Sequence, residues 1–205
     1  MIRIAVIGCG GINSWVAKHL NEVAEIFDKK ELFYVKLFDK DEVEEKNLLR
    51  NNQNFEIKDL MQQKANVLGK RYNFDFQTVF IDENNVSLLN NFDDIILGVD
   101  NNKTRKLIYE FALKHKKYLL DLKAQGTAMA FVVLDSTKTI DYYDKLFFNN
   151  KEVMERKGSC QLSEDIEKDH LENANKIIAM FGIYGIYLKH LRGEEVLMKD
   201  WKMVY

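Results

Sequence analysis

The feature that most constrains this chain is a glycine loop near its start, set between an apolar strand and an amphipathic helix. The loop is Gly8-Cys9-Gly10-Gly11-Ile12-Asn13. Residues 2–7 are apolar and largely β-branched, which predicts a buried strand, and Ser14 opens a helix predicted to run to about Asp28. Glycines let backbone N–H groups approach a phosphate, and the helix N-terminus adds partial positive charge. The segment therefore predicts an anion cradle for a nucleotide.

The residues after the loop favour a triphosphate over a nicotinamide dinucleotide. A dinucleotide site has a third glycine where this chain has Asn13, and an acid about 20 residues further on, whereas Asp39 comes later. Asp39 ends an apolar strand predicted at residues 34–38 and is followed closely by Asn47 and Arg50. An acid suits ribose hydroxyls, and an arginine fork matches phosphate oxygens bidentately.

Four blocks, in this order, resemble the ThiF/MoeB/HesA superfamily, which includes the activating enzymes of ubiquitin-like proteins. The blocks are Gly8-Cys9-Gly10-Gly11-Ile12-Asn13-Ser14, Asp39-x-Asp41-x-Val43 leading to Asn47-Leu48-x-Arg50, Lys64, and Gly98-Val99-Asp100-Asn101 with Arg105. They span about half of the chain, from Met1 to roughly Asp121. One block alone is weak, but the ordered set is fairly specific.

The resemblance implies a role for each matching residue. The residues implied in ATP binding are Gly8, Gly10, Gly11, Asp39, Asp41, Asn47, Arg50 and Lys64. Asp39 would hold the ribose hydroxyls, while Asn47, Arg50 and Lys64 would contact the phosphates. Arg50, Lys64 and Asp100 would be catalytic, with Asp100 holding Mg²⁺ near the reacting phosphate.

The activity that the resemblance implies is adenylation. The C-terminal carboxylate of a ubiquitin-like or sulfur-carrier protein would attack the α-phosphate of ATP, release pyrophosphate and leave an acyl-adenylate. The resemblance also implies a homodimer. Sulfur-carrier activation, protein conjugation, peptide adenylation and tRNA-base dehydration share these blocks, so the class of substrate stays open.

Three departures from the family pattern stand out. Asn51 follows Arg50 where the family usually has glutamine, and Lys64 lies one residue later than in bacterial members. Many members carry an arginine upstream of the first strand that reaches the partner subunit's site, whereas Ile2 is already in the strand pattern and Arg3 is a poor substitute. Paired Cys-x-x-Cys motifs are absent, so we predict no structural zinc.

Each site residue also has a simpler structural interpretation. Asp39 could cap a turn, Arg50 and Lys64 could be solvated charges, and Asp100 could cap the helix that follows. Cys160, in Gly158-Ser159-Cys160-Gln161, is similar in setting to the ThiF-like proteins of PRTRC gene clusters. It could accept the activated acyl group, but we favour a buried, apolar role because most free cysteines have one.

Composition indicates one globular protein of the cytoplasm. The chain has 205 residues, 46% of them hydrophobic, and a net charge of −2, which excludes a general attraction for nucleic acid or acidic membranes. Only Cys9 and Cys160 are cysteines, and no signal peptide or membrane-spanning apolar run is visible. These features favour a reducing, cytoplasmic compartment without membrane contact.

The pattern of elements predicts an α/β fold, with a Rossmann-like, mostly parallel sheet covered by helices on both faces. Strands are predicted at residues 2–7, 34–38, 76–81, 94–99, 118–121 and 126–135. Helices are predicted at residues 14–28, 58–72, 102–115 and 164–191. We expect a single domain over residues 1–205, with a nucleotide-binding core at 1–135 and a crossover segment with a long C-terminal helix at 136–205.

Two other functions fit parts of the sequence. An NAD(P)-linked oxidoreductase would explain the glycine loop, but not Arg50, Lys64 and Asp100. A degenerate, non-catalytic ThiF-like module that binds a small protein is the other alternative, and the missing upstream arginine keeps it open.

Overall fold

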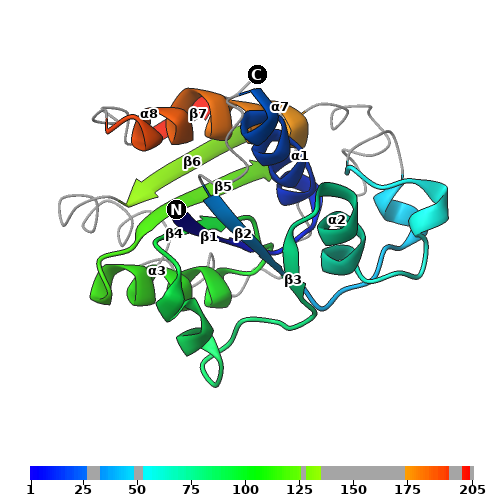
Figure 1. Ribbon diagram of the computed structural model, residues 1–205, viewed down its shortest axis with the longest axis horizontal. Coiled ribbons are helices and arrows are strands. Elements are labelled where there is room, and N and C mark those ends of the chain that lie inside the picture. Colours follow the sequence, from blue (N-terminus) through cyan, green and yellow to red (C-terminus); the bar gives the residue numbers. More distant parts are fainter. Residues whose placement is uncertain (27–32, 49–52, 126–127, 135–173, 194–199, 204–205) are drawn as a thin grey trace.

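A computed structural model shows one seven-stranded sheet with helices on both faces (Figure 1). It describes residues 1–26, 33–48, 53–125, 128–134, 174–193 and 200–203. The strands are β1 (Ile2–Ile7), β2 (Phe33–Phe38), β3 (Asp75–Gln77), β4 (Asp94–Leu97), β5 (Tyr118–Gln125), β6 (Ala128–Leu134) and β7 (Asp200–Met203). Their order in the sheet is β3-β2-β1-β4-β5-β6-β7.

The sheet is parallel from β3 to β5, and antiparallel where β6 and β7 extend it. The described helices are α1 (Gly11–Ile26), α2 (Lys64–Tyr72), α3 (Asn102–Lys114), α7 (Ala174–Met180) and α8 (Leu188–Leu191), with a π-helix, η7 (Phe181–Tyr187), between the last two. Short 3-10 helices lie at η1 (Glu45–Asn47), η3 (Ile57–Asp59) and η4 (Val86–Asn91). The predicted Rossmann-like α/β fold is confirmed.

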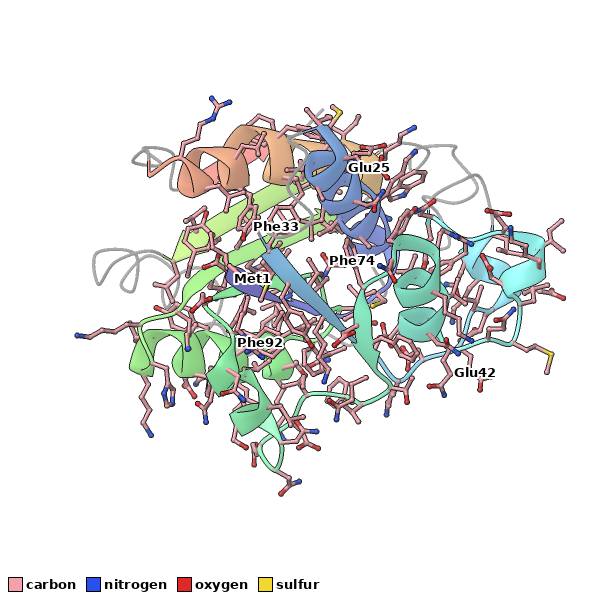
Figure 2. All side chains as sticks on the ribbon, viewed as in Figure 1. Met1, Glu25, Phe33, Glu42, Phe74 and Phe92 are labelled. Atoms are coloured by element: carbon pink, nitrogen blue, oxygen red, sulfur yellow. The ribbon has the colours of Figure 1, made fainter. Side chains whose placement is uncertain are left out.

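Successive side chains along each strand point to opposite faces of the sheet, so the core has two layers, one on each face. In β1, Ile4 and Val6 pack with α1, α2 and α7 on one face, while Ala5 and Ile7 pack with α3 on the other. Side chains fill both layers in Figure 2, with Phe74 on the α2 side and Phe92 on the α3 side. Central parallel strands buried on both faces read as near-continuous apolar runs, which is why the sequence predicted them well.

The third strand is shorter than predicted. β3 ends at Gln77, where residues 76–81 were expected to continue the strand. Its partner β2 ends at Phe38, and Asp39 N donates to the Gln77 carbonyl at 3.3 Å just beyond the paired residues. Residues 78–81 therefore have no neighbouring strand to pair with, and they turn towards the carboxyl edge of the sheet.

The helix predicted at residues 58–72 is also interrupted. Only α2, from Lys64, is an α-helix, because the preceding residues pair with the segment after β2 instead. Met61 N donates to the Val43 carbonyl at 3.0 Å, and Lys64 N donates to the Asp41 carbonyl at 2.8 Å. Met61 takes a left-handed φ of 61° at the turn. This pairing fixes the start of α2 beside the end of β2.

The C-terminal part differs in detail from the expectation. β5 runs to Gln125 rather than Asp121, and β6 returns antiparallel to it. Of the helix predicted at 164–191, the described portion begins with Ala174 and contains the π-helical turns of η7. Among the described residues, none of the helices has the length and apolarity needed to cross a membrane.

Candidate active site

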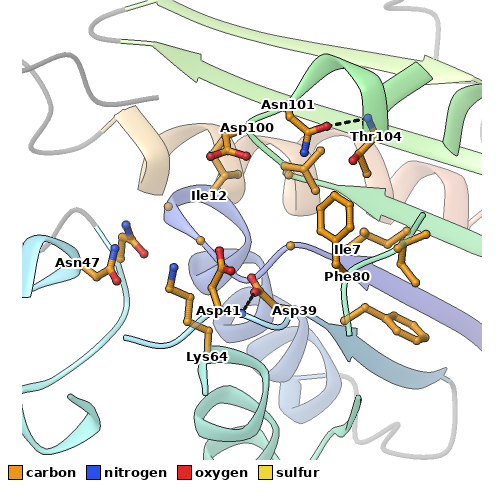
Figure 3. A pocket seen from close by; sticks show the side chains of 18 of the residues that line it. Ile7, Ile12, Asp39, Asp41, Asn47, Lys64, Phe80, Asp100, Asn101 and Thr104 are labelled. Carbon is orange, nitrogen blue, oxygen red and sulfur yellow. Dashed lines mark hydrogen bonds between the residues drawn. The ribbon is translucent and has the colours of Figure 1, made fainter. Parts of the chain in front are cut away.

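The carboxyl ends of β1, β2 and β4 surround a cavity of about 210 Å³. Figure 3 shows this cavity with side chains from the loops that follow these strands. Eight residues singled out from the sequence line it, namely Gly8, Gly10, Gly11, Asp39, Asp41, Asn47, Lys64 and Asp100. Arg50 and Cys160 lie outside the described residues. Ligands in open α/β sheets bind at this edge, so the cavity is the candidate active site.

The glycines of the loop meet three different surroundings. Gly8 has a φ of 81°, and a Cβ there would lie 3.0 Å from the Gly98 carbonyl oxygen. A Cβ on Gly11 would lie 2.4 Å from Asn175 Nδ2 on α7, whereas a Cβ on Gly10 would meet no atom within 4 Å. Gly8 and Gly11 thus allow close packing of the backbone, while Gly10 leaves space open within the cavity.

Asn13, in the place of the third dinucleotide glycine, links α1 to the end of β1. Its Nδ2 donates to the Ile7 carbonyl at 2.9 Å, and the side chain is fully buried. A Cβ on Gly98 would lie 2.6 Å from the Asn13 amide, so Gly98 is required for this contact. The amide therefore bonds to the end of β1 and packs closely against the loop after β4.

Asp39 is held by backbone donors from both sides of the cavity. Its Oδ2 accepts from Cys9 N at 2.6 Å, and its Oδ1 accepts from Asp41 N at 2.7 Å (Figure 3). Burial raises the pKa of the Asp39 carboxyl, and these N–H donors and the nearby Lys64 oppose the rise. Each carboxylate oxygen keeps a further lone pair, so Asp39 can still accept ribose hydroxyls.

Lys64 and Asn47 present donors to the same space. Lys64 is 7% exposed at the first position of α2, and Figure 3 shows it pointing into the cavity between Asn47 and Asp41. Asn47 Oδ1 accepts from Glu44 N at 2.8 Å, which fixes the amide and leaves Nδ2 to donate elsewhere. An ammonium and an amide N–H are the groups that bind phosphate oxygens.

Asp100 does not cap α3, although it lies just before that helix. Asn101 is the N-cap of α3, and its Oδ1 accepts from Thr104 N at 2.7 Å. The Asp100 side chain is exposed, and no hydrogen bond or ion pair joins it to another described residue. Within the part of the chain that the structure describes, no group of three or more His, Cys, Asp or Glu could hold a metal. Mg²⁺ commonly takes one or two carboxylates plus substrate phosphates, so Asp100 fits such a site.

The comparison of the sequence with protein families identifies the family of the chain. The match is to the ThiF family, over residues 1–183. The chain belongs to the ThiF family. No curated protein matches it in sequence.

Solved structures share the fold of this ThiF chain. A complex of E. coli MccB with AMPCPP and selenomethionine MccA is similar, with a TM-score of 0.74 and 14% identity, over 100% of this chain and 60% of that chain. E. coli MccB with ATP has a TM-score of 0.68 and 14% identity, over 100% and 60%. Selenomethionine PaaA has a TM-score of 0.64 and 15% identity, over 99% and 72%. The chain therefore spans only 60% of these MccB chains.

The sequence analysis did not identify several other residues that line the cavity. The cavity is also lined by Gln53, Val79, Phe80, Ile81 and Asn175. Val79 to Ile81 form an apolar wall beyond β3, and the Lys40 ammonium lies 5.3 Å from the centre of the half-exposed Phe80 ring. An apolar wall and a ring suit a nucleobase. The sequence predicted that these apolar residues continue the strand. The structure shows that β3 ends at Gln77 and that the residues after it line the cavity.

Cys9 is unsuited to nucleophilic chemistry although it belongs to the glycine loop. Its side chain is fully buried, and burial raises the pKa of the thiol well above its ordinary value, with the charge of Asp39 adding to the rise. A thiol attacks as its thiolate, which is disfavoured here. Cys9 is therefore a packing residue within the ThiF core.

Proposed function

We propose that this protein is an ATP-dependent adenylyltransferase that activates the C-terminal carboxylate of a peptide, ubiquitin-like or sulfur-carrier protein. The observation that carries the proposal is the convergence of the glycine loop, Asp39, Asn47, Lys64 and Asp100 on one cavity. ThiF membership supports the same chemistry. MccB, which shares the fold, has been crystallised with ATP and with AMPCPP together with MccA.

In this proposal the cavity positions ATP along its length. The apolar wall at Val79 and Phe80 receives the adenine, and Asp39 accepts the ribose hydroxyls. The backbone N–H groups of the glycine loop, together with Asn47 and Lys64, surround the phosphates. The loop N–H groups on one side and Asn47 and Lys64 on the other donate to the phosphate oxygens. They orient the α-phosphate without a covalent bond to the protein.

The reaction that follows is an in-line displacement at the α-phosphorus. A carboxylate oxygen of the substrate forms a bond to phosphorus, and the bond from phosphorus to the pyrophosphate oxygen breaks. Negative charge builds on the pyrophosphate, where Lys64 and Arg50 supply positive charge. A bound Mg²⁺, held by Asp100, would neutralise phosphate charge further. The products are the acyl-adenylate and pyrophosphate.

We also propose that the chain acts as a single domain, as a homodimer and in the cytoplasm. The first rests on the continuous sheet formed by β1 to β7. The other two rest on the family resemblance and on the composition of the chain. They are independent of the chemistry at the cavity.

Pyrophosphate exchange tests the proposed reaction. The protein is incubated with ATP, Mg²⁺ and labelled pyrophosphate, with synthetic C-terminal tails of the small proteins encoded beside its gene. We expect tail-dependent exchange, and Arg50→Ala should lower its rate by about 100- to 1000-fold, with much less effect on ATP affinity. ATP binding without exchange for any tail would favour the non-catalytic module instead.

A further inference from the structure

Gln53 carries a buried polar atom that the fold leaves without a partner. Its side chain is 7% exposed and lines the cavity. The oxygen Oε1 is buried and accepts no hydrogen bond from any described residue. A buried acceptor without a donor costs free energy, and native proteins rarely keep one unless a ligand or water supplies the missing bond. Gln53 therefore points to a hydrogen-bond donor that arrives with a ligand.

The backbone next to Gln53 is firmly fixed at the glycine-loop end of the cavity. Asn54 N donates to Ser14 Oγ at 3.0 Å, and Ser14 Oγ donates to the Gly11 carbonyl at 3.0 Å. Asn54 Nδ2 donates to Tyr72 OH at 2.5 Å, so α1 and α2 both hold this segment. These bonds place Gln53 beside the first turn of α1, at the glycine-loop end of the cavity.

That location excludes the nucleotide as the source of the missing donor. Phosphate oxygens lie at the glycine-loop end, and they only accept hydrogen bonds. The hydrogen-bond donors of ATP are its adenine amino group and its ribose hydroxyls. In the proposed function the adenine lies at the apolar wall and the ribose hydroxyls bind Asp39. The substrate carboxylate must approach the α-phosphate, and the last residue of a peptide carries an N–H group only two bonds from that carboxyl carbon.

We propose that Gln53 recognises the backbone N–H of the last residue of the peptide or carrier substrate, through Oε1. The inference rests on the proposed adenylation and adds a specificity residue to it. Gln53 reads the peptide backbone, so the site accepts different side chains at the last position. It discriminates against a last residue whose nitrogen carries no hydrogen, such as proline.

Adenosine-tethered ligands test this inference without knowledge of the natural substrate. The probes are 5′-O-sulfamoyladenosine, its glycylglycyl derivative, and a glycylsarcosyl derivative in which a methyl group replaces the hydrogen of the last amide. Calorimetry measures each affinity for wild type and for Gln53→Met, which keeps the side-chain length but has no amide. Gln62→Met is the control, because Gln62 lies on the same segment but is exposed and bonds to the Lys58 carbonyl.

We expect N-methylation to weaken binding to wild type and to Gln62→Met by about three- to tenfold, the effect of one hydrogen bond. Gln53→Met should bind both dipeptidyl probes equally and sulfamoyladenosine as tightly as wild type does. Its unfolding temperature should be no lower than that of wild type, because the substitution removes an unpaired acceptor.

Other outcomes would overturn the inference. Equal binding of the two dipeptidyl probes to wild type would show that the N–H is not recognised. Weaker sulfamoyladenosine binding by Gln53→Met would assign the amide to the nucleotide, and a lower unfolding temperature would show that the protein or a water already satisfies it. If wild type binds neither sulfamoyladenosine nor ATP, the proposed function itself fails, which is a different result.

Discussion

Arg105 reaches from α3 to β5 and forms a buried ion pair with Asp121. The same guanidinium donates to the carbonyl of Val99, the residue before Asp100. Arg105 is 5% exposed and Asp121 is fully buried. One side chain thus joins a helix, a strand and the loop that carries the proposed metal ligand. Arg105 acts as a positioning residue for the site.

Removing this guanidinium should destabilise the protein strongly. Arg105→Ala removes the buried guanidinium from the Asp121 carboxylate, while Lys123 Nζ stays 3.3 Å from it. We expect the free energy of unfolding to fall by about 3 kcal/mol, measured by urea denaturation. Lys103→Ala is the matched control on the same helix, because that side chain is 83% exposed and should change stability by less than about 0.5 kcal/mol. Equal effects of the two substitutions would contradict the structural role of Arg105.

Two glycine substitutions should separate stability from binding. Gly8→Ala forces a side chain onto a φ of 81° and against the Gly98 carbonyl, so it should lower the unfolding free energy by about 1 to 3 kcal/mol. Gly10→Ala meets no atom within 4 Å and should leave stability unchanged, yet its methyl group enters the cavity and should weaken ATP binding. Thermal unfolding and calorimetry measure the two effects. A Gly10→Ala protein that binds ATP normally would place the phosphates elsewhere.

The pKa of Asp39 predicts how nucleoside binding depends on pH. The ionised carboxylate accepts ribose hydroxyls, so affinity should be constant above the folded-state pKa of Asp39 and fall as pH drops through it. Burial raises that pKa, so the fall should begin above the ordinary aspartate value of about 3.9. Titration with adenosine removes phosphate protonation from the measurement, and comparison with Asp39→Asn accounts for protonation of the adenine. Asp39→Asn should bind weakly and without this pH dependence, and an unchanged slope in that variant would assign the titration to another group.

The sequence predicted the elements whose residues are governed by local pattern. The strands β1, β2 and β4 were placed within one or two residues, because apolar runs buried on both faces leave little choice. Residues 78–81 were misread as strand, because Val79 and Ile81 are apolar where they pack against the core beside α3 and Phe80 lines the cavity, without pairing in the sheet. The helix before Lys64 was also wrong, because pairing of Met61 with Val43 overrides helical periodicity.

The site was predicted where residues lie at the ends of consecutive strands. Asp39 was found in this way, because parallel strands bring their carboxyl ends to one edge, whereas Asp100 was found through the resemblance to the ThiF family. Asn175 could not be found, since only the folded chain brings α7 against Gly11. Gln53 follows no strand, and its significance lies in an unmade hydrogen bond that no sequence pattern records.

The two cysteines should differ in reactivity, and the difference makes the role of Cys160 testable. Cys9 is fully buried with a raised pKa, so it should not react with a thiol reagent in the native protein. We favour a packing role for Cys160, in which case Cys160→Ser should leave adenylation and transfer intact. Non-reducing electrophoresis after incubation with ATP and a substrate protein checks this. A reductant-sensitive adduct in wild type that Cys160→Ser lacks would instead identify Cys160 as the acyl acceptor.

Calorimetric titration of the protein with ATP and Mg²⁺, and separately with NAD, tests the central claim most directly. Lys64 lines the cavity at the start of α2, so Lys64→Ala should weaken ATP binding by about tenfold or more, whereas exposed Lys103→Ala should not change it. We predict ATP binding by wild type that depends on Lys64, and no binding of NAD. NAD binding with no response to ATP would contradict the proposed adenylyltransferase.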